Sequence, residues 1–182
     1  MAQFVPFQDG VEVNGQTVLS IVNALEAGRS TRLKIMEKHG IVDPQFAGWY
    51  SQKAWLDAFR EISEELGIHT LFAIGEAIPE NAIFPPEIND LNKALASIDV
   101  AYHLNHRGGE IGHYTLTDFA SDKRKAVMVC NNPYPSEFDR GIISTMVRKF
   151  VPQKSFIYDV QLDTSKETRL KGADSCTYII TW

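Results

Sequence analysis

The feature that most constrains the fold is a change in hydrophobic periodicity close to Gly108 and Gly109. Before this point, apolar residues recur at steps of three and four, the spacing of amphipathic helices. After it, apolar and polar residues nearly alternate, as they do in strands with one buried face. We therefore expect a mainly helical part over 1–107 and a sheet part over 108–182. A run of helices followed by strands is typical of an α+β fold with an antiparallel sheet.

The helical part begins with a short strand at 11–13 and a turn at Asn14-Gly15. Glycines and a proline mark the ends of helices, because glycine adopts left-handed backbone and proline lacks an N–H group. Gly40 ends the second helix, Gly67 the third, and Pro79 the fourth. The predicted helices cover 17–27, 31–38, 51–66, 69–77 and 88–107.

The sheet part has the order strand, strand, helix, strand, strand. The strands are predicted at 111–119, 126–130, 156–162 and 176–182, and the helix at 138–150. Ser136 is the expected cap of this helix, with Asp139 three residues later as a weak capping box. One face of this helix is a stripe of large apolar residues, which must be buried against another part of the structure. We therefore expect both hairpins, 111–130 and 156–182, to form one antiparallel sheet with this helix packed on one face.

Length, charge and hydropathy indicate one domain that binds neither nucleic acid nor a membrane. The 182 residues suit one domain, predicted here as a single sensor-like domain over 1–182. The formal net charge of −5 gives no basic field for nucleic acid phosphates. No stretch approaches the roughly 18 apolar residues of a membrane helix, and residues 1–10 lack the pattern of a signal peptide. The expected location is the cytoplasm, where Cys130 and Cys176 are expected as reduced thiols on neighbouring strands.

Three of the five histidines fall within eleven residues, and they are the first candidates for chemistry. His103 and His106 share a helix end, and His113 follows shortly after, with Glu110 between them. Imidazoles at such spacing can bind a metal ion, or one can ligate haem iron. The alternative stays open, because histidines at helix ends also interact well with the terminal carbonyl groups.

A second candidate is the segment 131–140, which joins a strand to the start of a helix. Backbone N–H groups there, with Ser136 and Arg140, can hold a carboxylate or a phosphate. The favoured alternative is that Ser136 caps its own helix and Arg140 pairs with a surface acid. The sequence has no Gly-x-Ser-x-Gly elbow, phosphate loop, Rossmann glycine pattern or His-Glu-x-x-His motif.

The last twelve residues and the order of elements resemble a known superfamily. Residues 171–182, Lys-Gly-Ala-Asp-Ser-Cys-Thr-Tyr-Ile-Ile-Thr-Trp, are similar to the closing signature of 4-vinyl reductase-type domains. The helical block before strand-strand-helix-strand-strand resembles the related haem nitric oxide/oxygen-binding (H-NOX) domains. The resemblance implies the same fold and a role in sensing a small molecule.

The resemblance also implies haem as a possible cofactor. The family's axial histidine lies near the end of the helix before the sheet. The stretch 98–103 looks like that helix end, so His103 is the expected ligand and His106 the spare.

The family grips the haem propionates with Tyr-x-Ser-x-Arg. Tyr134 and Ser136 match the first two positions, Phe138 stands at the arginine position, and Arg140 lies two residues later.

The function that follows is a non-catalytic small-molecule sensor or ligand-binding domain of H-NOX/4-vinyl reductase type. Its partners would be a small apolar or tetrapyrrole-like ligand, a signalling protein and a second copy of the chain. Two alternatives stay open: an enzyme or accessory protein acting on tetrapyrroles, and an interaction module without a ligand. The ligand pocket is expected between the helical part and the sheet, lined by Trp55, Phe59, Phe72, Ile98 and Tyr102.

Overall fold

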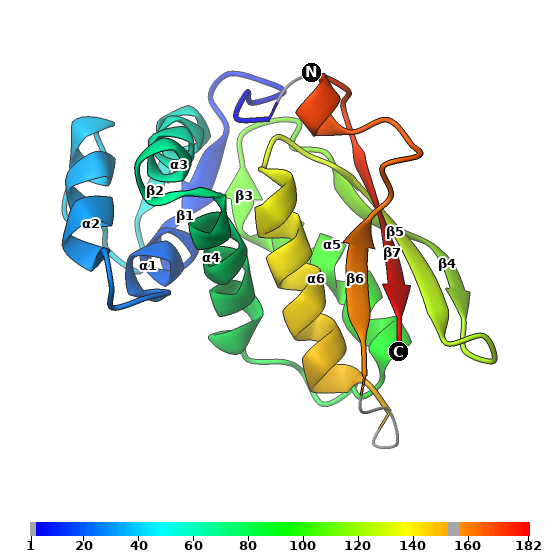
Figure 1. The fold of residues 1–182 in the computed structure, drawn as a ribbon. Helices are drawn as coiled ribbons and strands as arrows, with labels where there is room; N and C mark the ends of the chain where they lie inside the picture. Colours follow the sequence, from blue (N-terminus) through cyan, green and yellow to red (C-terminus); the bar gives the residue numbers. More distant parts are fainter. Residues whose placement is uncertain (1–2, 153–156) are drawn as a thin grey trace.

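The structure is a computed structural model that describes residues 3–152 and 157–182. A block of helices lies on one side and a sheet on the other, with helix α6 between them (Figure 1). The helices are α1 (Gly15–Asn23), α2 (Arg29–Lys38), α3 (Gln52–Leu66), α4 (Ile68–Glu80), α5 (Leu91–Leu104) and α6 (Ser136–Phe150), with a 3-10 turn η1 (Arg169–Lys171). The strands are β1 (Glu12–Asn14), β2 (Trp49–Ser51), β3 (His106–Arg107), β4 (His113–Ala120), β5 (Lys125–Asn131), β6 (Asp159–Leu162) and β7 (Cys176–Thr181). The predicted α+β fold, helical block first and antiparallel sheet second, is confirmed.

The larger sheet has the order β4-β5-β7-β6, and every neighbouring pair is antiparallel. Both predicted hairpins therefore belong to one sheet, as expected from the sequence. Cys130 stands directly opposite Cys176 in the register of β5 and β7, and both cysteines are buried free thiols. The beginning of the predicted strand at 156–162 lies partly outside the described residues.

Helices α5 and α6 contact this sheet, α5 along β4 and α6 along β6. The stripe that predicted this packing is buried, with Ile143 and Val147 fully shielded from solvent. Burying each such side chain contributes roughly 1.5–3 kcal/mol. The other side of α6 packs on α4, so that α6 forms the layer between the helical block and the sheet.

A second, smaller sheet of order β2-β1-β3 was not predicted beyond its first strand. Its strands have only two or three residues, too short for a period of two to be visible in the sequence. The expected turn at Asn14-Gly15 is instead the start of α1. The Asn14 side chain accepts a hydrogen bond from the Thr17 N–H at 2.9 Å and so caps the helix.

Two further local predictions were wrong. Pro79 lies inside α4, which runs on for one more residue to Glu80. Ser136 does not cap α6 with its hydroxyl; Pro135 is the cap residue, and the Ser136 N–H donates to Gln3 Oε1 at 2.6 Å. The expected capping partner, Asp139, is buried elsewhere in the structure.

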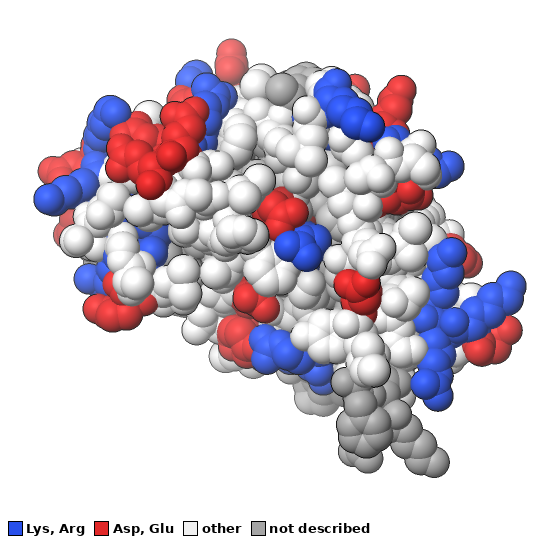
Figure 2. Space-filling view, in the orientation of Figure 1, with Lys and Arg blue, Asp and Glu red and all other residues white. Residues whose placement is uncertain are grey.

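The face drawn in Figure 2 carries charged side chains of both signs, with a group of acidic side chains at the upper left and a group of basic ones at the lower right. Among the described residues, no helix combines the length and apolar character needed to cross a membrane.

Candidate functional site

An apolar cavity of about 90 Å³ lies between α4, α5, α6 and β4. Helix α6 lines it with Phe138, Ile142 and Met146, whose four-residue steps place them on one helix face. Helix α5 contributes Ile98 and Tyr102 from the facing side. The remaining lining residues are Thr17, Ile78, Pro79, Ala82, Phe84, Ser97, Ala101, Asn105, His106, Tyr114 and Tyr134.

One end of the cavity is polar, and His106 is its centre. The His106 Nδ1 lies 2.8 Å from the Tyr102 carbonyl, and Nε2 lies 2.7 Å from the Tyr134 hydroxyl. Because a carbonyl only accepts, Nδ1 carries the proton and Nε2 accepts from Tyr134. Burial lowers the pKa of His106 to about 4, so the imidazole is neutral at pH 7.

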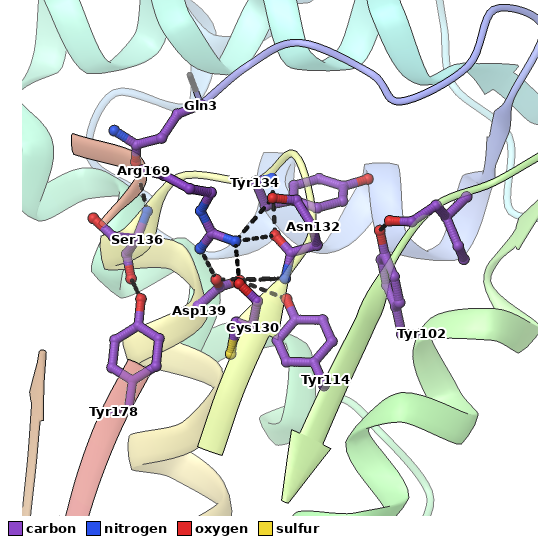
Figure 3. A network of polar contacts seen from close by, with 11 residues as sticks. Gln3, Tyr102, Tyr114, Cys130, Asn132, Tyr134, Ser136, Asp139, Arg169 and Tyr178 are labelled. Carbon is purple, nitrogen blue, oxygen red and sulfur yellow. Dashed lines mark hydrogen bonds and ion pairs between the residues drawn. The ribbon is translucent and has the colours of Figure 1, made fainter. Parts of the chain in front are cut away.

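A buried ion pair stands behind this end of the cavity. Arg169, from η1, pairs with Asp139 of α6, and both side chains are inaccessible to solvent. Arg169 Nη1 also donates to the backbone carbonyls of Cys130 and Asn132, at 2.7 and 2.8 Å (Figure 3). The pair thereby fastens the segment around η1 to the end of β5 and the start of α6.

Tyr114 connects the ion pair with the cavity. Its ring lines the cavity, and its hydroxyl donates to Asp139 Oδ1 at 2.6 Å. Burial raises the pKa of Asp139 against the opposing effect of Arg169. Burial lowers the pKa of Arg169, but Asp139 together with Cys176, Tyr178 and Cys130 raises it overall, so the guanidinium keeps its charge. In this buried pair, Arg169 opposes the rise in the Asp139 pKa, and Asp139 favours the charged form of Arg169.

The structure brings only part of the predicted pocket together. Ile98 and Tyr102 line the cavity. Trp55 and Phe59 are buried behind it, where Phe59 makes edge contacts with Tyr134 and Phe138 at centroid distances of 6.0 and 5.2 Å. Phe72 lies elsewhere, beneath the Arg140 guanidinium at 4.4 Å. The α3 residues do not reach the cavity because Tyr134 and Phe138 stand between them.

The structure also separates the three histidines. His106 is buried at the cavity, whereas His103 and His113 stand outside it with side chains 42% and 57% exposed. The expected haem ligand, His103, is thus exposed, whereas the spare, His106, is buried at the cavity. The helix ends at Leu104, so His106 already belongs to β3 and turns inwards with that strand.

The Tyr-x-Ser segment has structural contacts in this arrangement. The Tyr134 hydroxyl is bound to His106, and the Ser136 carbonyl accepts from the Tyr178 hydroxyl at 2.7 Å. Arg140 pairs with Glu137 on its own helix at 2.6 Å, the surface pairing that the sequence favoured. Sequence reasoning missed Arg169 and Asp139, since a pair 30 residues apart carries no local signal.

Haem does not fit the cavity in this conformation. A cavity of about 90 Å³ is well below the roughly 300–1,000 Å³ of pockets that bury drug-sized ligands, and haem is larger still. The only imidazole among the lining residues, His106, has both nitrogens in hydrogen bonds. Phe138, at the arginine position of the family motif, is buried and apolar. Haem would need a rearrangement of Tyr134 and its neighbours.

The chain was compared with known proteins. No protein-family model matches it, and neither does any curated protein. Solved structures do match. A mutant H-NOX protein from S. oneidensis in the Fe(II) ligation state superposes with a TM-score of 0.68 at 14% identity, covering 92% of this chain and 95% of that one. The S. oneidensis protein in the Fe(II)NO state gives 0.67 at 15% identity, with coverages of 92% and 97%.

A point mutant of H-NOX from T. Tengcongensis superposes with a TM-score of 0.61 at 12% identity, covering 91% of this chain and 94% of that one. These similarities extend over both the helical part and the sheet part. The chain has an H-NOX-like fold.

Proposed function

We propose that this chain is a non-catalytic small-molecule sensor or ligand-binding domain, and that the cavity between α4, α5, α6 and β4 is its ligand site. The proposal rests on the apolar lining of that cavity, which has a single polar end at His106 and Tyr134. Apolar cavities of this kind stay free of water and bind apolar molecules of matching size.

The size of the cavity limits the ligand. An engineered apolar cavity of about 150 Å³ binds benzene or xenon. A cavity of about 90 Å³ suits a diatomic gas or an apolar molecule with a few non-hydrogen atoms.

The lining supports binding rather than catalysis. It contains no carboxylate and no thiol among the described residues. Its one group with a pKa ordinarily near neutral, His106, is held neutral by burial. General acid–base catalysis works best with a pKa near the working pH. A signalling partner protein, a second copy of the chain and a cytoplasmic location are further predictions that accompany this function.

Haem is the second candidate ligand, supported by the similar H-NOX structures in Fe(II) and Fe(II)NO states. The His106 Nδ1–H donates to the Tyr102 carbonyl, the arrangement that usually orients an iron- or zinc-bound imidazole. If Tyr134 moves away from Nε2, His106 is the imidazole placed to bind iron. The buried position of His106 makes it a better candidate ligand than the exposed His103.

The test of the cavity uses xenon, which needs no iron. Xenon should shift the methyl resonance of Met146 in the wild-type protein, because this side chain lines the cavity. Ala101→Trp, at an exposed position on the cavity lining, should block the shift. Val100→Trp is the matched control, since Val100 is 61% exposed and is not among the lining residues.

A wild-type protein without a xenon shift would remove the cavity as a site for small apolar ligands. An absorption spectrum of the purified protein, before and after addition of haem, separates the two candidates. A Soret band would assign haem, and a colourless protein with a xenon shift would assign a ligand held without haem.

A further inference from the structure

A cluster of possible metal ligands lies on the outer side of α5, away from the cavity. Asp99 and His103 are one turn apart on α5, and His113 is the first residue of β4. One candidate ligand atom from each side chain lies within 4.8 Å of the others. No other group of three His, Cys, Asp or Glu side chains comes this close in 3–152 and 157–182. We propose that Asp99, His103 and His113 bind a divalent transition-metal ion such as Zn²⁺.

The distances from the two histidines to the Asp99 carboxylate are longer than ordinary hydrogen bonds. His113 Nδ1 lies 3.4 Å from both carboxylate oxygens of Asp99, and His103 Nδ1 lies 3.6 Å from Oδ2. An N–H···O hydrogen bond is usually about 2.9–3.0 Å long, so these contacts are loose. Ligand atoms around a tetrahedral zinc, each about 2.1 Å from the metal, are about 3.4 Å apart. His113 and Asp99 thus already have the spacing that one ion imposes, and a ligand atom of His103 lies within 4.8 Å of theirs.

The ring arrangement agrees with this assignment. The His103 and His113 rings have centroids 4.9 Å apart and are tilted by 33°. Two protonated imidazoles would repel each other at this distance, whereas two neutral ones can bind the same cation. The Asp99 carboxylate lies beside both rings and supplies the negative charge.

The surrounding backbone orients the ligands. Asp99 Oδ1 accepts from the Tyr114 N–H at 2.8 Å, and the His103 Nδ1–H donates to the Asp99 carbonyl at 2.9 Å, which leaves His103 Nε2 as the nitrogen for the metal. Metal ligands are usually held by such outer hydrogen bonds, and their loss typically weakens metal binding 10- to 100-fold. The side chains are partly exposed, so an ion can enter from solvent without any rearrangement of the core.

The donor set indicates the class of metal. Two imidazoles and one carboxylate suit Zn²⁺, Ni²⁺, Co²⁺ or Cu²⁺, whereas Mg²⁺ and Ca²⁺ prefer oxygen ligands alone. Three protein ligands leave at least one position for water. A bound ion would join the end of α5 to the start of β4, next to Tyr102 and Tyr114 of the cavity.

The experiment is a calorimetric titration of the purified protein with Zn²⁺, with thermal unfolding as a second readout. We expect one ion per chain, and an increase in Tm with Zn²⁺, because a ligand of the folded state stabilises it. Asp99→Asn, His103→Ala and His113→Ala should each weaken binding by at least about 10-fold. His69→Ala, at another exposed histidine on α4, is the control and should bind as the wild type does.

Mg²⁺ should give neither heat nor an increase in Tm. The proposal is overturned if Zn²⁺ does not bind, if the three variants bind as tightly as the wild type, or if His69→Ala weakens binding as much as they do. Asp99→Asn should still fold, because its amide oxygen can accept the hydrogen bond from the Tyr114 N–H. Weaker Zn²⁺ binding by this variant would therefore reflect the loss of the carboxylate.

Discussion

Gly75 of α4 and Gly141 of α6 face each other where the two helices cross. A Cβ atom at Gly75 would lie 2.1 Å from the Phe138 carbonyl oxygen, and one at Gly141 would lie 2.2 Å from the Phe72 carbonyl oxygen. Both obstacles are backbone atoms, which cannot move without separating the helices. The absence of two side chains therefore sets how closely α6, which lines the cavity, approaches the helical block.

Gly141→Ala should destabilise the protein by about 1–3 kcal/mol, the usual cost of forcing extra atoms into a packed core. The sign of the change in stability tests the close contact between the helices. In an unobstructed helix interior, alanine would stabilise the protein by roughly 1 kcal/mol relative to glycine. Urea unfolding of the wild type and of Gly141→Ala measures the difference. A variant more stable than the wild type would show that the helices are not in close contact here.

The buried histidine makes stability depend on pH. Burial lowers the pKa of His106 to about 4 in the folded state, from about 6.5 when unfolded. The unfolded state therefore binds the proton first, and stability present above pH 6.5 is lost as pH falls towards 4. Protonation of His106 should lower the free energy of unfolding by about 3 kcal/mol over this pH range. Urea unfolding at several pH values should show a smaller loss in His106→Gln, whereas an equal loss in both proteins would contradict the buried neutral imidazole.

Haem reconstitution distinguishes the two histidines near the end of α5. If the protein takes up haem, His106→Ala should abolish or strongly shift the Soret band, because His106 alone among the described imidazoles lines the cavity. His103→Ala should leave the band in place, since His103 stands on the outer surface beside His113. The reverse result would favour His103, the residue to which the family resemblance pointed. Absorption spectra of the two variants at equal protein concentration provide the comparison.

The thiols provide a prediction about redox state. Directly opposite residues of antiparallel strands have Cα atoms about 4.5–5.5 Å apart, within the range of a disulfide. Burial raises the pKa of both Cys130 and Cys176, so little reactive thiolate forms. We expect no alkylation of the native protein and alkylation of both cysteines after denaturation, measured by mass spectrometry. A denatured protein that resists alkylation until it is reduced would reveal a bridge.

A structural feature can be predicted from the sequence when the residues that determine it are close together in the chain. The stripe on α6 repeats every three or four residues, so it correctly predicted both the helix and its packing on the sheet. The inward turn of His106 depends on β3, a two-residue strand paired with β1 some 93 positions earlier in the chain. No local pattern carries such a pairing, and therefore the sequence does not show that the spare, His106, is buried while the expected ligand, His103, is exposed.

For the candidate site too, only the features that depend on nearby residues in the chain were predicted. Ile98 and Tyr102 follow from the face of α5, which is a local property. Phe138 was considered only as a departure from a motif, although it supplies much of the apolar wall opposite α5. Tyr134 and Phe138 displace Trp55 and Phe59 from the cavity, and such competition between side chains is decided by three-dimensional packing alone.

The stability of the protein should be sensitive to the loss of either partner in the buried pair of Arg169 and Asp139. Removing one partner of a buried ion pair leaves an uncompensated charge and typically costs about 3–5 kcal/mol. Arg169→Met and Asp139→Asn should each approach that loss, with Arg169→Met also releasing the carbonyls of Cys130 and Asn132. The double variant should lose less than the sum, because neither charge then remains unpaired. Urea unfolding of all three variants measures this coupling.

The exposed pair of Lys53 and Asp57 is the control for that comparison. Its nitrogen and oxygen are 2.6 Å apart on the surface of α3, and the Lys53 side chain is 66% exposed. Such pairs contribute about 0.2–1 kcal/mol, so Lys53→Ala should change stability little. If Arg169→Met cost no more than Lys53→Ala, the ion pair would not be what holds η1 against β5 and α6. A large loss with clear coupling would instead show that the wall behind Tyr114, and with it one end of the cavity, depends on this contact.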